Sequence, residues 1–127
     1  MLESGLHSLL SADSTLSELV GTRIYPVFVP ESTAFPCLSY QVVSGSSDVA
    51  LDDTVVREKR IQFDAWAQTY GVSKQIESAL AEILEGYSGT LEDGTTILDC
   101  VPSITLDNWE ATSHIYRITA EYTLSFV

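Results

Sequence analysis

Most of the last dozen residues of the chain alternate strictly between apolar and polar side chains. The alternation extends to Phe126, and its apolar members are Tyr116, Ile118, Ala120, Tyr122, Leu124 and Phe126. Successive side chains of a strand point to opposite faces of a sheet, so an alternation of this length requires one face to be buried. The chain must therefore contain a sheet with a core on one side, and we expect this strand to lie inside the sheet.

Two segments carry the periodicity of amphipathic helices. The first begins near Leu2, and a second short helical turn follows it at residues 16–20, closed by Gly21. The other segment has one apolar stripe over residues 72–84, and Gly86 is placed to cap its end. Both segments have a face to bury against the predicted sheet.

The segments before the long helix read mostly as strands. Residues 37–43 and 55–67 are rich in β-branched and aromatic side chains, and the polar residues 44–54 are expected to connect them. In the second strand, the side that carries Asp64 is the polar one. Residues 23–30 contain two prolines, which predicts an extended segment or an edge strand.

After the long helix, Asp93-Gly94 is typical of a hairpin turn, and residues 97–106 read as a strand in which Pro102 indicates a bulge or an edge. Only one helix separates the two groups of strands, so a regular series of βαβ units is absent. The sequence predicts an α+β fold with a mostly antiparallel sheet and two main helices packed on one face. We expect residues 1–127 to form a single domain.

The charge balance restricts the partners of this chain. Eighteen acidic residues face six basic ones, which gives a formal net charge of −12. Such a surface repels phosphate backbones and anionic lipids, so direct binding of nucleic acid or membranes is disfavoured. The sequence contains no apolar stretch that approaches a membrane span, and Met1 to Gly5 lacks the pattern of a signal peptide. We therefore expect the protein to be made in the cytoplasm of the producing cell.

The common catalytic and metal-binding constellations are absent from the sequence. His7 and His114 have no second ligand at metal spacing, and no phosphate-binding loop or nucleophile elbow is present. Cys37 and Cys100 are expected to be buried free thiols. The sequence thus predicts no catalytic residue, no cofactor and no metal.

One enzymatic alternative remains open, a small divalent-metal-dependent hydrolase. Asp52, Asp53 and Asp64 are the carboxylates that could bind its metal, although the favoured interpretation is that they are solvated loop acids and a surface aspartate. A nuclease of this kind also needs basic residues to hold its substrate, and this chain has few.

Large aromatic side chains occur at positions where burial is not expected. Tyr25 and Phe28 lie in the proline-flanked segment, Trp66 on the polar side of its strand, and Trp109 in a turn-like stretch. Aromatic residues with charged neighbours are common interface anchors, so these four are candidates for a subunit or partner interface. The alternative is that they cap the two ends of the core.

The order of the segments resembles that of the tail-completion, or tail-terminator, proteins of long-tailed bacteriophages and prophages. Four features carry the resemblance, and the last strand also fits. They are the helix Leu6-x-x-Leu9-Leu10-x-Ala12-Asp13 leading to Leu16-x-x-Leu19-Val20-Gly21, then Arg23-Ile24-Tyr25-Pro26, then Phe35-Pro36-Cys37-Leu38-Ser39-Tyr40-Gln41, and Arg60-Ile61-Gln62-Phe63-Asp64-Ala65-Trp66-Ala67 followed by Thr69-Tyr70.

The resemblance implies a structural protein without catalytic residues. It implies a ring, commonly a hexamer, at the head-proximal end of the tail tube in the virion, where it stops tube growth and meets the head connector. DNA would pass through the lumen without specific binding, which suits an acidic ring. We expect the acidic residues Asp48, Asp52 and Asp53 to face the lumen or an adjoining ring. Another head–tail joining protein and an adaptor unrelated to phages are the remaining alternatives.

Overall fold

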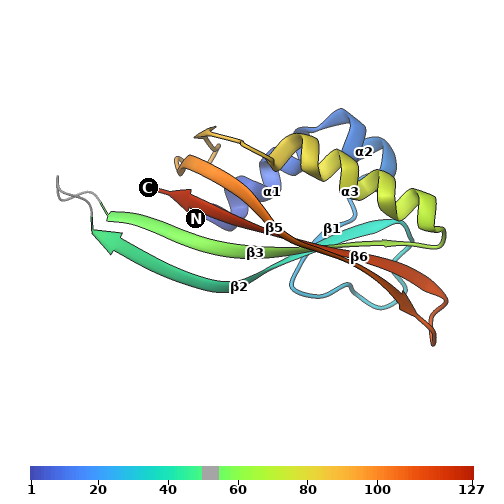
Figure 1. Cartoon of the computed structure of the whole chain (residues 1–127). Helices are drawn as coiled ribbons and strands as arrows, with labels where there is room; N and C mark the ends of the chain where they lie inside the picture. Colours follow the sequence, from blue (N-terminus) through green and yellow to red (C-terminus); the bar gives the residue numbers. More distant parts are fainter. Residues whose placement is uncertain (50–54) are drawn as a thin grey trace.

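The computed structural model describes residues 1–49 and 55–127 and shows helices on one side of a sheet (Figure 1). The helices are α1 (Leu2–Ala12), α2 (Ser14–Val20) and α3 (Tyr70–Leu84). The strands are β1 (Ile24–Pro26), β2 (Cys37–Val49), β3 (Val55–Ala67), β4 (Gly89–Thr90), β5 (Thr96–Glu110) and β6 (Ile115–Phe126). The predicted α+β class and the packing of helices on one face are confirmed.

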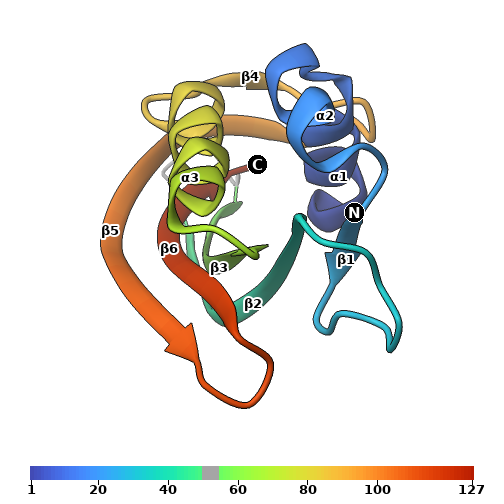
Figure 2. The same ribbon diagram turned by 90° about the vertical axis from the view of Figure 1, so that its right-hand side faces the viewer.

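The six strands form one sheet in the order β1-β2-β3-β6-β5-β4. Strand β1 runs parallel to β2, and all other neighbouring strands are antiparallel. Strand β6 lies between β3 and β5, so the prediction that the alternating segment is an interior strand is confirmed. Figure 2 shows that the sheet curls around the helices, which occupy its concave side.

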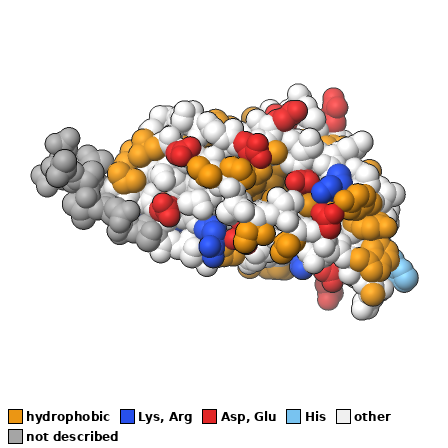
Figure 3. Space-filling model, viewed as in Figure 1, with side chains coloured by type: hydrophobic (Ala, Val, Ile, Leu, Met, Phe, Trp, Pro, Cys, Tyr) orange, Lys and Arg blue, Asp and Glu red, His pale blue; other side chains and the backbone are white. Residues whose placement is uncertain are grey.

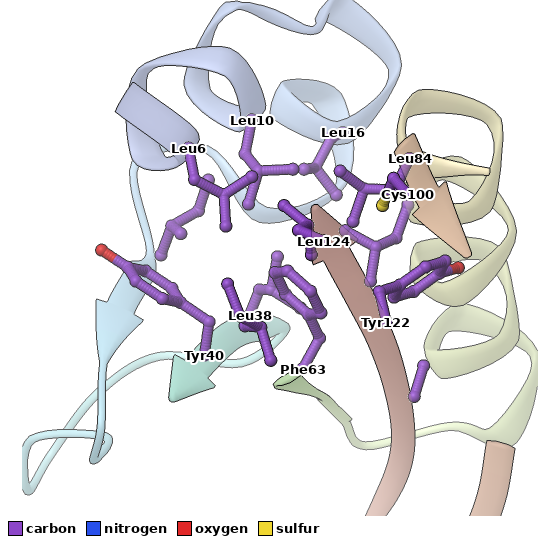
Figure 4. Close-up of a cluster of buried hydrophobic side chains, with 14 of the residues drawn as sticks. Leu6, Leu10, Leu16, Leu38, Tyr40, Phe63, Leu84, Cys100, Tyr122 and Leu124 are labelled. Atoms are coloured by element: carbon purple, nitrogen blue, oxygen red, sulfur yellow. The ribbon is translucent and has the colours of Figure 1, made fainter. Parts of the chain in front are cut away.

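The core lies between the helices and the concave face of the sheet. Leu6, Leu10 and Leu16 project from the first two helices toward Leu38 and Phe63 of the sheet (Figure 4), and each of these five side chains is at most 1% exposed. Full burial of one such side chain stabilises the fold by about 1.5–3 kcal/mol. The core therefore depends on the apolar stripes that the sequence predicted.

Helices α2 and α3 end at the predicted glycines, and α2 begins at a side-chain cap that the sequence did not predict. The Asp13 side chain accepts a hydrogen bond from the Leu16 amide at 2.9 Å, which caps the start of α2. Gly21 and Gly86 follow α2 and α3 with φ angles of 60° and 71°. These positive φ angles favour glycine, because other residues meet a steric penalty there.

The strands are longer than the sequence indicated. Strand β2 continues to Val49, so residues 44–49 belong to a hairpin with β3 and not to the expected polar connection. Asp48 lies in this strand opposite Val56, whereas Asp52 and Asp53 lie outside the described residues. Backbone hydrogen bonds to β3 maintain the strand, and these bonds do not require alternating side chains.

Two further features concern the edges of the sheet. Strand β5 continues through residues 107–110, so Trp109 lies in a strand rather than in the expected turn, opposite Tyr116 of β6. The expected irregularity at Pro102 is present, because the register of β5 shifts between Pro102 and Ile104. Only Ile24 to Pro26 of the proline-flanked segment pair with β2, at the outer edge of the sheet as predicted.

Candidate assembly surfaces

The loop after β1 carries two strongly exposed apolar side chains. Val27 and Phe28 are 68% and 69% exposed. They line an open hollow of about 550 Å³ together with the rest of residues 27–33, Phe35 and Trp66. We call residues 27–33, Phe35 and Trp66 the loop patch. The structure thus brings two of the candidate aromatics, Phe28 and Trp66, to one site, and it places Tyr25 half-buried in the adjacent strand β1.

Trp66 is held in place by polar contacts. Its indole Nε1 donates a hydrogen bond to Ser39 Oγ at 3.0 Å, and the Arg117 guanidinium lies 5.2 Å from the ring centroid. The ring is half-buried, so it forms the inner wall of the loop patch while Phe28 stands free at its rim. A fixed wall beside an exposed aromatic is the usual form of a pocket that receives a partner side chain.

A second aromatic cluster lies where β5, β6 and the start of α3 meet. Trp109 packs on Tyr116 with ring centroids 4.7 Å apart, and His114 and Tyr70 pack edge-on against these two rings. Trp109 is 49% exposed and Tyr70 is 44% exposed. We call Tyr70, Trp109, His114 and Tyr116 the hairpin patch, because it lies beside the β5–β6 turn.

Hydrogen bonds to the Asp107 carboxylate connect helix α3 to strand β5 beside the hairpin patch. Asp107 accepts hydrogen bonds from the Tyr70 hydroxyl at 2.6 Å and from Lys74 Nζ at 3.2 Å. Both contacts lower the pKa of the Asp107 carboxyl, and the hydrogen bond from Tyr70 has the larger effect. These contacts connect α3 to β5, and they hold the Tyr70 ring in position within the hairpin patch.

The two patches lie at the same height along the strands but near opposite edges of the sheet. Trp66 is opposite Arg117, and Arg117 is opposite Asn108, the neighbour of Trp109. The loop patch adjoins β1 and the hairpin patch adjoins β5. Hydrophobic side chains gather at this end of the molecule, away from the grey tip (Figure 3).

Asp64 does not lie on the surface as the sequence suggested. It is 5% exposed, and its carboxylate accepts hydrogen bonds from Thr119 Oγ1 at 2.5 Å and from Gln62 Nε2 at 2.9 Å. Arg117 lies 4.0 Å away. Within residues 1–49 and 55–127, no group of three or more His, Cys, Asp or Glu side chains is arranged to hold a metal ion.

The two cysteines are buried free thiols, as expected. Burial is the main cause that raises the pKa of Cys37 to about 11 and the pKa of Cys100 to about 12. Since the thiolate is the reactive form, both side chains are chemically quiet near neutral pH.

A third surface feature was not predicted from the sequence. Seven consecutive residues of β5, from Val101 to Asp107, are all exposed, and so are residues 42–45 of β2. Both faces of each segment are therefore uncovered. Among the described residues, β1 pairs only with Leu38 to Tyr40 of β2, and β4 pairs only with Thr96 and Ile97 of β5.

The helices have no membrane-spanning character in the described part of the chain. None of them is both long and apolar enough to cross a bilayer. The longest is α3, with 15 residues.

Comparison with known proteins agrees with the resemblance found in the sequence. A chain from a structure described as the virion of a native gene transfer agent particle superposes with a TM-score of 0.79 over 98% of this chain and 93% of that chain, at 17% sequence identity. No curated protein matches the sequence. The model of the family described as tail completion protein gp17 matches residues 4–124. The chain therefore belongs to the tail completion protein gp17 family.

Proposed function

We propose that this protein forms a ring at the head-proximal end of a tail tube, ends the growth of the tube and joins the tail to the head connector. Membership of a tail completion family supports a structural role over the hydrolase alternative. The similarity in fold to a chain of a gene transfer agent virion supports assembly into a particle. We thus propose three things: that the protein forms a ring, that the ring contacts the tail tube and the head connector, and that it lies between them in the virion.

The observation that carries the proposal is the pair of unlike patches at one height on opposite sides of the sheet. A cyclic ring uses a heterologous interface, in which one surface of each copy meets a different surface of the next. Rotation about an axis parallel to the strands keeps height unchanged. In the ring that we propose, the hairpin patch of one copy therefore lies level with the loop patch of its neighbour, and Trp109 enters the hollow that Phe28 and Trp66 line.

The charge of the chain fits a conduit for DNA. Each copy carries a formal charge of −12, so a ring of several copies repels the phosphate backbone and lets DNA slide. We propose that Asp48, Asp52 and Asp53 face the lumen or an adjoining ring. If changing all three to asparagine leaves both assembly and infectivity unaltered, this assignment of the acidic residues is wrong.

Light scattering and negative-stain imaging of the purified protein, alone and with tail tubes, test the proposal. We expect rings of about six chains, in solution or on the tube ends. Phe28→Ser and Trp109→Ser should each prevent ring formation while the monomer stays folded, since both side chains are exposed. Val127→Ser, at a position 43% exposed and outside both patches, is the control.

A different result would point to another role. Binding to portal-bearing heads with no binding to tail tubes would assign the protein to another head–tail joining step. A monomer that binds neither would contradict the proposal.

A further inference from the structure

We propose that the exposed segment of β5 pairs, edge to edge and antiparallel, with the exposed segment of β2 in the next copy of this chain. The inference rests on the proposed ring and specifies how its subunits join. It concerns the backbone edges, which are distinct from the two aromatic patches.

The composition of the two segments is unusual for exposed strand edges. Residues 41–45 of β2 and 101–106 of β5 contain no charged residue, although the whole chain carries 24 of them. The segments expose Val42, Val43, Val101, Ile104 and Leu106 at 38–55%. Natural proteins normally protect free edges with charged side chains, because an uncharged open edge invites another strand.

The heights of the two segments match. Ser44 is opposite Arg60, Arg60 is opposite Thr123, and Thr123 is opposite Val101. These four residues therefore form one row across the sheet, from its β2 side to its β5 side, and they point to the same face. The rotation that brings the hairpin patch to the loop patch also brings Val101 of one copy beside Ser44 of the next.

A second row gives the same result. Gln41 is opposite Gln62, Gln62 is opposite Glu121, and Glu121 is opposite Ile104. The register of β2 shifts between Val42 and Ser44, and that of β5 shifts between Pro102 and Ile104. The two irregularities thus fall between the same pair of rows, so an interchain ladder can continue on both sides of them.

The directions of the strands also agree. Strands β2, β3, β6 and β5 are antiparallel at each step, so β5 runs opposite to β2 within one copy. Rotation about an axis along the strands preserves these directions, so β5 meets the neighbouring β2 in antiparallel orientation. Pro102 lacks an amide hydrogen, so it makes the β5 edge of an unassembled copy less able to pair with other strands. In the proposed contact, the residues on either side of Pro102 donate the hydrogen bonds to β2 of the next copy.

Disulfide cross-linking between separately prepared variants tests the pairing. Ser44→Cys and Val101→Cys proteins are mixed and oxidised, and Gln41→Cys and Ile104→Cys form a second pair that tests the same register in the other row. The native thiols are buried and protonated at pH 8, so they do not contribute. We expect heterodimers only in the mixtures, and a ladder up to the ring from the double variant Ser44→Cys/Val101→Cys.

Charged substitutions give an independent readout. Ile104→Lys at the β5 edge should abolish the ring, whereas Ser78→Lys, at an exposed position of α3, should retain it. Homodimers in the single-variant preparations, with no heterodimers in the mixtures, would show a symmetric contact and overturn the inference. If rings form in solution or on tail tubes but no combination cross-links, the edge pairing is wrong and the ring proposal stands. If no ring forms on tail tubes, the ring proposal itself fails.

Discussion

Replacing Thr119 with valine removes one buried hydroxyl and keeps the shape of the side chain and its preference for strands. The hydroxyl donates to Asp64 Oδ1 at 2.5 Å, and both residues are 5% exposed. The variant leaves a buried carboxylate without one of its donors, while Gln62 still donates to the other oxygen at 2.9 Å. We therefore expect Thr119→Val to destabilise the fold.

The size of the effect follows from the charge of the acceptor. A hydrogen bond to a charged group contributes about 1.5–3 kcal/mol. A chain of 127 residues unfolds near its midpoint with an entropy of roughly 0.27 kcal/mol/K, at about 2.1 cal/mol/K per residue. A loss of about 2 kcal/mol therefore lowers the melting temperature by roughly 7 °C.

Urea unfolding at pH 7, followed by tryptophan fluorescence, measures this loss. Thr123→Val is the matched control, because Thr123 lies on the same face of β6 and is half-buried. It should change the free energy of unfolding by no more than about 0.5 kcal/mol. In an Asp64→Asn background the effect of Thr119→Val should fall to about 1 kcal/mol, since the acceptor is then neutral. Equal losses in the two threonine variants would refute the reasoning.

Three further predictions concern stability. Gly5→Ala should destabilise the protein by more than about 1 kcal/mol, because the new Cβ would overlap the Asp93 carboxylate. Gly71→Ala, which has open space around the new Cβ, should stabilise the protein by up to about 1 kcal/mol. The melting temperatures of the two variants should therefore shift in opposite directions. Asp13→Ala should cost about 1 kcal/mol through loss of the α2 cap, while Asp13→Ser, which keeps an acceptor, should retain most of the stability in the same assay. Stability should fall as the pH rises from about 8.5 toward 12, because the Cys100 thiol ionises first in the unfolded chain and burial raises its pKa in the folded protein to about 12; Cys100→Ala should reduce this slope in urea titrations and leave the part that comes from Cys37, whose pKa is raised to about 11, and an unchanged slope would contradict the assignment.

Periodicity was sufficient to predict the elements that bury one face. Strand β6 and helix α3 each present a regular pattern of side chains to the core, and Gly86 follows α3 as expected. Residues 42–45 of β2 and residues 101–107 of β5 have no such signal, because their side chains are all exposed and the backbone ladder maintains these segments. The sequence accordingly placed residues 44–49 in a connection and Trp109 in a turn.

The candidate site was predicted by residue type and not by arrangement. Exposed aromatics suggested Phe28, Trp66 and Trp109 individually, but their grouping depends on the fold of the loop after β1 and on pairing between β5 and β6. Asp64 was assigned to the surface because its strand alternates. Its burial depends on the cross-strand partner Thr119, which lies 55 residues away in the sequence.

The central position of β6 has a consequence for the order of folding and assembly. Among the described elements it comes latest in sequence, yet it pairs on both sides, with β3 and with β5. A chain in which β6 has not docked has no continuous sheet and cannot hold the two outer edges at matching heights. Any oligomer that requires both edges must therefore wait until β6 lies between β3 and β5.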